Sequence, residues 1–203
     1  MWAIVTDGSI TKIINQPKPL VIGNTQYSRN IFSFRWSNEE REAIGLYEVV
    51  FDNTNKKDEK YYTNTNQTFA FADGAVTASY GSPTAKALAD RNATDRDGVE
   101  LDPVVVIPGL KTKHKERIKQ QASNLLTAYD WYVIKATDVE SYSVPGAITT
   151  YRAAVRTASN DMETLIDNCS TVDELATLYQ YVNTGTEENP VMERPLGEFP
   201  EAV

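Results

Sequence analysis

Histidine chemistry would have to come from one residue, because His114 is the only histidine in the sequence. It lies in the segment KTKHKER, where lysines and an arginine surround it. Neighbouring cations disfavour a protonated imidazole, and no obvious carboxylate would orient the ring as in a general acid or base. A single histidine also supports neither a histidine-based metal cluster nor a catalytic triad. We therefore expect His114 to occupy an exposed position on a helix.

Three carboxylates have a spacing near that of a cation site. The segment ATDRDGVELD places Asp95, Asp97 and Glu100 around Gly98, which is similar to the start of a calcium-binding loop. The segment lacks the third early ligand, and its glutamate does not stand at the required spacing. We therefore expect a solvated turn here.

Nucleophilic and phosphate-binding motifs are absent from the sequence. No serine lies in a G-x-S-x-G pattern, and no glycine-rich phosphate loop occurs. No pair of carboxylates is nominated for glycan hydrolysis, so a glycan hydrolase is the least favoured function class. The single Cys169 excludes an intrachain disulfide and a cysteine-based zinc cluster, and we expect it to be a small buried side chain. The sequence predicts a protein that is not an enzyme, with no cofactor and no metal.

Charge and hydropathy narrow the possible partners. The net charge of −8 argues against broad binding of nucleic acid or anionic membranes. No apolar run approaches the length of a membrane span, and the N-terminus lacks the features of a signal peptide. The basic run 111–119 is open to two interpretations, contact with phosphate or a solvated helix face beside acidic groups, and the second is favoured. We expect a soluble protein with neither a nucleic-acid nor a membrane partner.

The first 81 residues predict a strand-rich domain with a short helix. Asp7-Gly8 and Asp73-Gly74 each separate two alternating apolar segments, and the pair supplies the positive φ angles of a tight hairpin turn. Ser37 and Glu40 have the spacing of a capping box, which opens a helix that we expect to end near Gly45. A strand should follow at 46–51.

Residues 82–110 are expected to form a linker, because they show no sustained period. Within it, the β-branched run 104–107 is flanked by Pro103 and Pro108, which limit it to an edge strand or an extended connector.

Residues 111–185 predict a small helical domain. Apolar residues recur at helical spacing in 112–127, and a second helix should begin near Pro145. Between them, 131–134 has an extended character, and we expect Trp131 to be a buried plug between the two helices. A capping box at Thr171 and Glu174 should open a further helix through Tyr181. Residues 186–203 are acidic and proline-punctuated, which predicts an extended tail. The predicted fold class is α+β.

Residues 117–156 also carry a family resemblance. The pattern RIKQQASNLL, DWYVIK and YRAAVR resembles the C-terminal region of bacteriophage tail and tail-fibre assembly proteins. That region combines a basic helix ending in Leu-Leu, an Asp-Trp pair, a short linker that often contains proline, and a Tyr-Arg-x-x-x-Arg helix. Here these elements are Leu125-Leu126, Asp130-Trp131, Pro145 and Tyr151-Arg152 with Arg156.

The resemblance implies a binding protein without an active site. It indicates a tail-fibre assembly chaperone that binds a phage tail or tail-fibre protein in the host cytoplasm. The alternative is a structural component or adaptor retained in the virion tail or fibre.

Five residues are the candidate partner-binding positions. Arg152 and Arg156 lie four apart and should share one side of their helix, either contacting a partner or pairing within the chain, for example with Asp130 or Asp138. The other three are the apolar side chains of the tail, Met192, Leu196 and Phe199.

Overall fold

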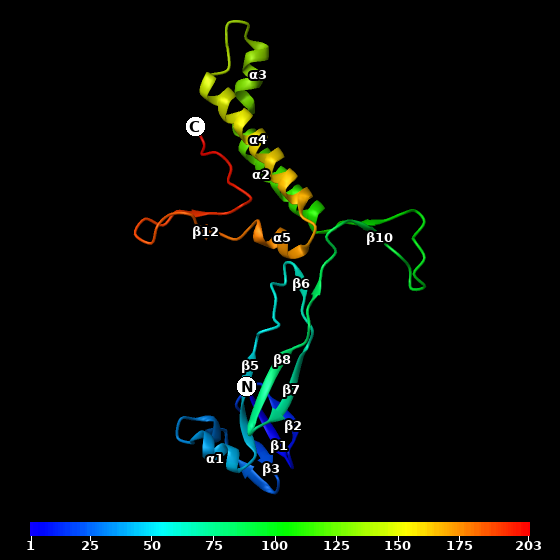
Figure 1. Ribbon diagram of the computed structural model, residues 1–203, viewed down its shortest axis with the longest axis vertical. Helices are drawn as coiled ribbons and strands as arrows, with labels where there is room; N and C mark the ends of the chain where they lie inside the picture. Colours follow the sequence, from blue (N-terminus) through cyan, green and yellow to red (C-terminus); the bar gives the residue numbers. More distant parts are fainter. The chain divides into compact units, whose positions relative to one another are not determined.

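The computed structural model describes residues 1–203, which divide into two compact units, Met1–Thr84 and Ala85–Val203 (Figure 1). The first unit is strand-rich and the second contains the long helices. The predicted α+β fold class is therefore confirmed.

A five-stranded sheet forms the body of the first unit. Its order is β2-β1-β5-β8-β7, in which β5 and β8 are parallel and the other neighbours are antiparallel. Because the edge strands β2 and β7 also approach each other, the sheet curls into a half-barrel. The strands are β1 (Trp2–Thr6), β2 (Ser9–Ile14), β5 (Leu46–Asp52), β7 (Gln67–Ala72) and β8 (Ala75–Tyr80).

Both predicted Asp-Gly hairpins are present in this sheet. Asp7 and Gly8 have φ angles of 52° and 75°, and Asp73 and Gly74 have φ angles of 49° and 74°. Two consecutive positive φ angles match the right-handed twist of the flanking strands, which is why this dipeptide closes tight hairpins. The turns thereby fix the registers of β1 with β2 and of β7 with β8.

Each face of the sheet packs against a hydrophobic cluster. One cluster contains Ala3, Val5, Val49, Val76 and Ala78; the other contains Ile4, Ile14, Leu20, Ile31 and Leu46. Small elements between β2 and β5 pack against the second cluster. A further short strand, β6, follows β5. These elements are β3 (Leu20–Ile22), β4 (Thr25–Tyr27), the 3-10 helix η1 (Arg29–Phe32), α1 (Asn38–Ala43) and β6 (Tyr62–Thr63). The N-terminal residue is also engaged, since the backbone N–H of Val49 donates to the carbonyl of Met1 at 3.0 Å.

Helix α1 has the start and the end that its sequence predicts. The Ser37 side chain accepts from the N–H of Glu40, and the Glu40 carboxylate accepts from the N–H of Ser37, so the capping box is confirmed. Gly45 follows with φ of 81°, and a Cβ at this position would lie 2.6 Å from the carbonyl oxygen of Val5. Only glycine fits this backbone approach.

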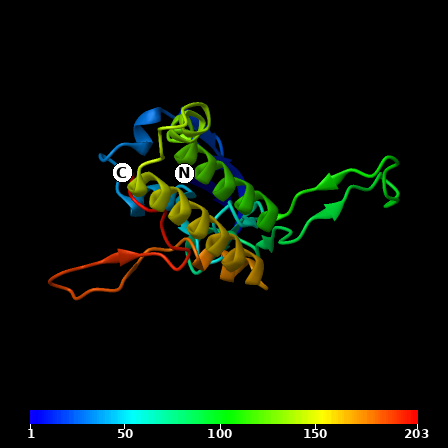
Figure 2. The same cartoon turned by 90° about the horizontal axis from the view of Figure 1, so that it is seen from above.

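Two long helices form the body of the second unit. Helix α2 (Leu110–Thr127) packs along α4 (Gly146–Asn168), and Figure 2 shows them side by side. Two shorter helices are α3 (Asp130–Asp138), which follows α2 after a two-residue break, and α5 (Val172–Thr177), whose predicted capping box at Thr171 is confirmed. No helix of the chain has both the length and the apolar character needed to cross a bilayer.

Two hairpins lie in the segments that the sequence predicted to be a linker and a tail. Strand β9 (Thr84–Ala85) precedes a hairpin of β10 (Arg91–Asn92) with β11 (Val106–Ile107). The edge-strand alternative for 104–107 is therefore confirmed for Val106–Ile107, whereas its partner strand at Arg91–Asn92, inside the predicted linker 82–110, was not predicted. A second hairpin joins β12 (Val182–Asn183) to β13 (Met192–Glu193), so the first part of the predicted tail is also paired. Figure 1 shows both hairpins leaving the helical body.

Two further expectations for the helical unit were wrong. Residues 131–134 belong to α3, not to an extended segment, and Trp131 is 51% exposed. His114 is buried on α2, with its ring centroid 4.8 Å from that of Tyr179. His114 lies at helical spacing from Leu110, Ile118 and Ala122, which form the buried face of α2, so its place on the helix and not its charged sequence neighbours decides its exposure.

Candidate functional site

An ion pair joins the Asp-Trp pair of the sequence pattern to its Tyr-Arg helix. The carboxylate of Asp130 lies 2.8 Å from Nη1 of Arg152, and the same nitrogen donates to the backbone carbonyl of Leu126 at 2.8 Å. The Arg152 side chain is only 11% exposed. The intrachain alternative for Arg152 is therefore confirmed: this residue fastens α4 to the end of α2 and the start of α3.

Aromatic packing surrounds the ion pair. Tyr151 is buried beside Ala122 and Val155, and its ring meets that of Tyr129 edge-on at 5.1 Å. Burial raises the pKa of Tyr151, and the repulsion that its phenolate would meet from an ionised Tyr129 adds to the effect. The buried Tyr151 hydroxyl has no hydrogen-bond partner in the protein. The position is therefore one that favours a neutral, apolar side chain.

Beside the ion pair lies an open groove between α2 and α4, of ≈ 430 Å³. We call it the α2–α4 groove. It is lined by Lys119, Ala122, Ser123, Leu126, Thr127 and Asp130 on one side and by Arg152, Arg156, Ser159 and Asn160 on the other. Within α2 and within α4 the lining residues repeat at three to four positions, which places them on one face of each helix, and Asp130 joins them from the start of α3.

The cations of the groove differ in how they are neutralised. Arg152 is paired with Asp130, and Lys119 lies 3.3 Å from the carboxylate of Glu163. Arg156 donates from Nη1 to the backbone carbonyl of Arg152 at 3.4 Å, and no carboxylate lies within ion-pairing distance of it. Arg156 is thus the cation of the groove whose charge the chain leaves uncompensated.

A second exposed feature is an apolar and aromatic surface on α3. Trp131 and Ile134 lie three positions apart, and Ile134 is 60% exposed. The ammonium of Lys135 lies 5.4 Å from the centroid of the Trp131 ring. We call these three side chains the α3 surface. The ion pair of Asp130 with Arg152 of α4 fixes the start of α3, and thereby the position of the α3 surface.

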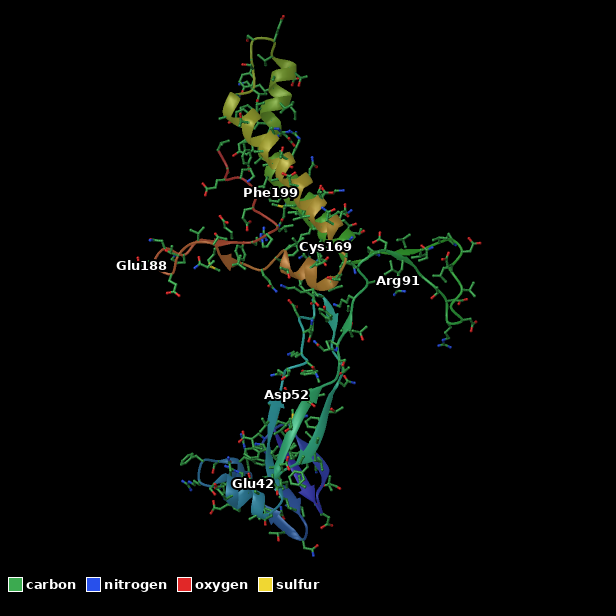
Figure 3. The ribbon with its side chains drawn as sticks, in the orientation of Figure 1. Glu42, Asp52, Arg91, Cys169, Glu188 and Phe199 are labelled. Carbon is green, nitrogen blue, oxygen red and sulfur yellow. The ribbon has the colours of Figure 1, made fainter.

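The three predicted tail residues have different environments. Leu196 is 2% exposed, and its N–H donates to the carbonyl of Leu178 at 3.0 Å. Phe199, labelled in Figure 3, packs against the cluster around Tyr151. Only Met192, on β13, is largely exposed. Leu196 therefore belongs to the interior and not to an exposed binding surface, because its side chain is almost completely buried.

A hydrogen bond also holds the tail beyond Phe199. The hydroxyl of Tyr129 donates to the backbone carbonyl of Val203 at 2.8 Å. Residues 194–203 therefore run back along the helices, whereas Glu188 lies at the far end of the β12–β13 hairpin (Figure 3).

The remaining chemical candidates have structural roles. Asp95 closes the predicted exposed turn by accepting from the N–H groups of Asp97 and Val99, each at 2.9 Å. Cys169 is buried as expected, and burial raises the pKa of its thiol, which disfavours the reactive thiolate. In the basic run, Lys115 pairs with Asp167 of α4 at 2.7 Å.

Four residues of the groove were not predicted as site residues. Ser123, Thr127, Ser159 and Asn160 are small polar residues at the border of each apolar helix face. Their helical spacing was a usable signal, but only the packing of α2 on α4 makes the two rows face each other.

No protein-family model, curated protein or solved structure matches this chain.

Proposed function

We propose that this chain is a non-enzymatic bacteriophage tail-associated protein that binds a tail or tail-fibre protein and acts in tail-fibre assembly in the host cytoplasm. Two things support the proposal. The first is the resemblance carried by Asp130-Trp131 and Tyr151-Arg152. The second, and the observation that carries most weight, is the exposure of Trp131 on the α3 surface.

The α3 surface has the composition and the rigidity of a binding site. Tryptophan is enriched among the residues that dominate binding energy, and a half-exposed indole beside an exposed isoleucine can be buried by a partner. The Asp130–Arg152 ion pair holds the start of α3, so less side-chain and backbone freedom is lost on association. A surface that is already ordered binds more tightly than a flexible one of the same area.

A second candidate function is a structural component or adaptor that remains in the virion tail or fibre. The observation that favours it is that the strand-rich unit has its own hydrophobic clusters, separate from the helical unit. Two independent bodies in one chain suit a role in which one unit is anchored and the other binds.

Co-purification with the tail and tail-fibre proteins of the same phage tests the binding function. The tagged chain is co-expressed with each of them, with Trp131→Ala and Ile134→Ser as test variants. Val21→Ser is the matched control, because Val21 is also 60% exposed but lies on β3 of the other unit. We expect one tail or fibre protein to be retained by the wild type and the control, and at least tenfold less by the test variants. Retention of none of these proteins by the wild type would contradict the proposal.

Quantitative mass spectrometry of purified phage particles separates the two candidates. An assembly protein is expected to be scarce in the particles relative to tail proteins. A fixed copy number per particle would instead establish the structural role.

A further inference from the structure

The α2–α4 groove is positively charged within an acidic protein. Its lining includes three cations, Lys119, Arg152 and Arg156, and one carboxylate, Asp130. The carboxylate of Glu163 neutralises Lys119, so one positive charge is left in excess, whereas the whole chain has a net charge of −8. Because Asp130 is engaged by Arg152, its charge is not available to Arg156. A local excess of positive charge in an acidic chain attracts anionic groups to this place specifically.

Arg156 has the donors to hold such a group. A guanidinium carries five N–H donors, and only one of them is used within the chain, by the carbonyl of Arg152. The planar fork of the guanidinium matches a carboxylate in a bidentate arrangement. Since α4 is held by the neighbouring Arg152, the position from which Arg156 extends is fixed.

The rest of the lining suits a peptide that carries the carboxylate. Ser123 and Thr127 on α2 and Asn160 on α4 add neutral hydrogen-bonding groups along the groove. A volume of ≈ 430 Å³ is within the range of small ligand sites, and the groove is open to solvent. An open groove admits a chain that passes through, so the carboxylate would belong to a side chain rather than to a chain end.

We propose that the α2–α4 groove binds an aspartate or glutamate side chain of the partner, with Arg156 as its bidentate ligand. This inference rests on the proposed function, because the acidic segment would belong to the bound tail or tail-fibre protein. The α3 surface would supply apolar contact and the groove would select for an acidic residue nearby. Charge complementarity of this kind gives specificity more than affinity.

The test uses the full chain and short blocked peptides that need no phage partner. The probe is acetyl-Gly-Gly-Glu-Gly-Gly-amide, whose only carboxylate is the glutamate side chain. It is titrated to millimolar concentration while the amide and Arg156 Nε–H signals are followed by NMR. The matched peptides are the glutamine analogue, which lacks the charge, and pentaglycine with a free C-terminus. We expect saturable shifts around Arg156 with the glutamate peptide, and at least tenfold weaker binding of both matched peptides.

Variants of the chain locate the interaction. Arg156→Gln is expected to weaken binding of the glutamate peptide at least tenfold, and Arg156→Lys to retain part of it, because lysine keeps the charge without the fork. Arg117→Gln is the matched control: it removes the same charge from an exposed position on α2 outside the groove. We expect it to bind like the wild type. Unchanged far-ultraviolet circular dichroism shows that the variants are folded.

Several results would overturn the inference. The first is that Arg156→Gln binds the glutamate peptide as tightly as the wild type does. The second is that the glutamine analogue or the pentaglycine with a free C-terminus binds at least as tightly as the glutamate peptide. The third is that inorganic phosphate binds more tightly than the glutamate peptide. The proposed function fails separately if the wild-type chain retains no tail or tail-fibre protein, and that result does not depend on the peptide titration. A chain that binds the glutamate peptide but no tail or fibre protein would contradict the function and leave the groove chemistry established.

Discussion

Asp130 and Arg152 lie 2.8 Å apart, and their ion pair connects the first residue of α3 with the second turn of α4. The two partners differ in environment, since the Asp130 side chain is 49% exposed and that of Arg152 is 11% exposed. Solvent screens the carboxylate, so the pair contributes less than a fully buried one. The greater cost should come from disturbing the buried arginine.

We expect Asp130→Ala to lower the free energy of unfolding by about 1–2 kcal/mol and Arg152→Ala by about 2–3 kcal/mol. The arginine variant also removes the bond to the Leu126 carbonyl, hence its larger effect. A double-mutant cycle by urea unfolding should give a coupling of about 1 kcal/mol. Arg156→Ala is the control, expected to change stability by less than about 0.5 kcal/mol because Arg156 has no ion-pair partner. Additive effects of the two test variants would show that the pair does not stabilise the unit.

Trp131→Ala should change stability little, in contrast to the 3–5 kcal/mol expected for a core tryptophan. Half of the indole is already in water, so we expect a loss below about 1.5 kcal/mol. Ile166→Ala on α4 is the comparison, because Ile166 is fully buried and its truncation should cost about 2–5 kcal/mol. Denaturant unfolding at neutral pH measures both. A loss as large for Trp131 as for Ile166 would contradict the exposed position.

Leu196→Ala should destabilise the helical unit by about 2–4 kcal/mol, because its side chain is buried beside α5. Met192→Ala, four residues earlier and largely exposed, should stay within about 0.5 kcal/mol of the wild type. The same reasoning predicts that deleting residues 194–203 destabilises the unit. Urea unfolding of Leu196→Ala and Met192→Ala measures the two losses. Equal losses would show that the Leu196 side chain is not packed in the interior.

Tyr151→Phe should remove one pH-dependent contribution to stability. Burial raises the pKa of Tyr151 in the folded chain above its unfolded value of about 10. The unfolded state therefore loses its proton first, so this stabilising contribution is complete below that value and is lost as pH rises through the folded pKa. At neutral pH the variant should be as stable as the wild type or more stable by about 1 kcal/mol, because the removed hydroxyl has no protein partner.

The measurement for Tyr151 is the free energy of unfolding between pH 8 and pH 11. Above the unfolded pKa the wild type should lose stability more steeply than the variant. Parallel curves for the two proteins would show that Tyr151 does not titrate differently in the folded and unfolded states.

Features set by neighbouring residues could be predicted from the sequence. The Asp-Gly turns need only a dipeptide that accepts positive φ angles, and the capping boxes at Ser37 and Thr171 need only a partner three residues on. The start of α4 after Pro145 has the same local origin. These elements do not depend on how the rest of the chain folds.

Features set by distant residues could not be predicted in the same way. The aromatic and β-branched residues of 131–134 favour a strand by propensity, but Arg152 holds Asp130 and α3 continues the path of α2 as a helix. The β10–β11 hairpin depends on pairing Arg91 with Ile107 across a long loop. The groove likewise exists only because α2 and α4 pack together. In each case the deciding contact joins residues that no short sequence window contains.

The contacts of Met1 with Val49 and of Val203 with Tyr129 bear on how the protein should be labelled. A fusion tag or fluorophore at either position would compete with these contacts and with the packing of Phe199. The loop around Glu188, at the end of the β12–β13 hairpin, is exposed and distant from the tail's packing sites. An epitope inserted there would report on the protein in cells or in phage lysates while both terminal segments keep their native contacts.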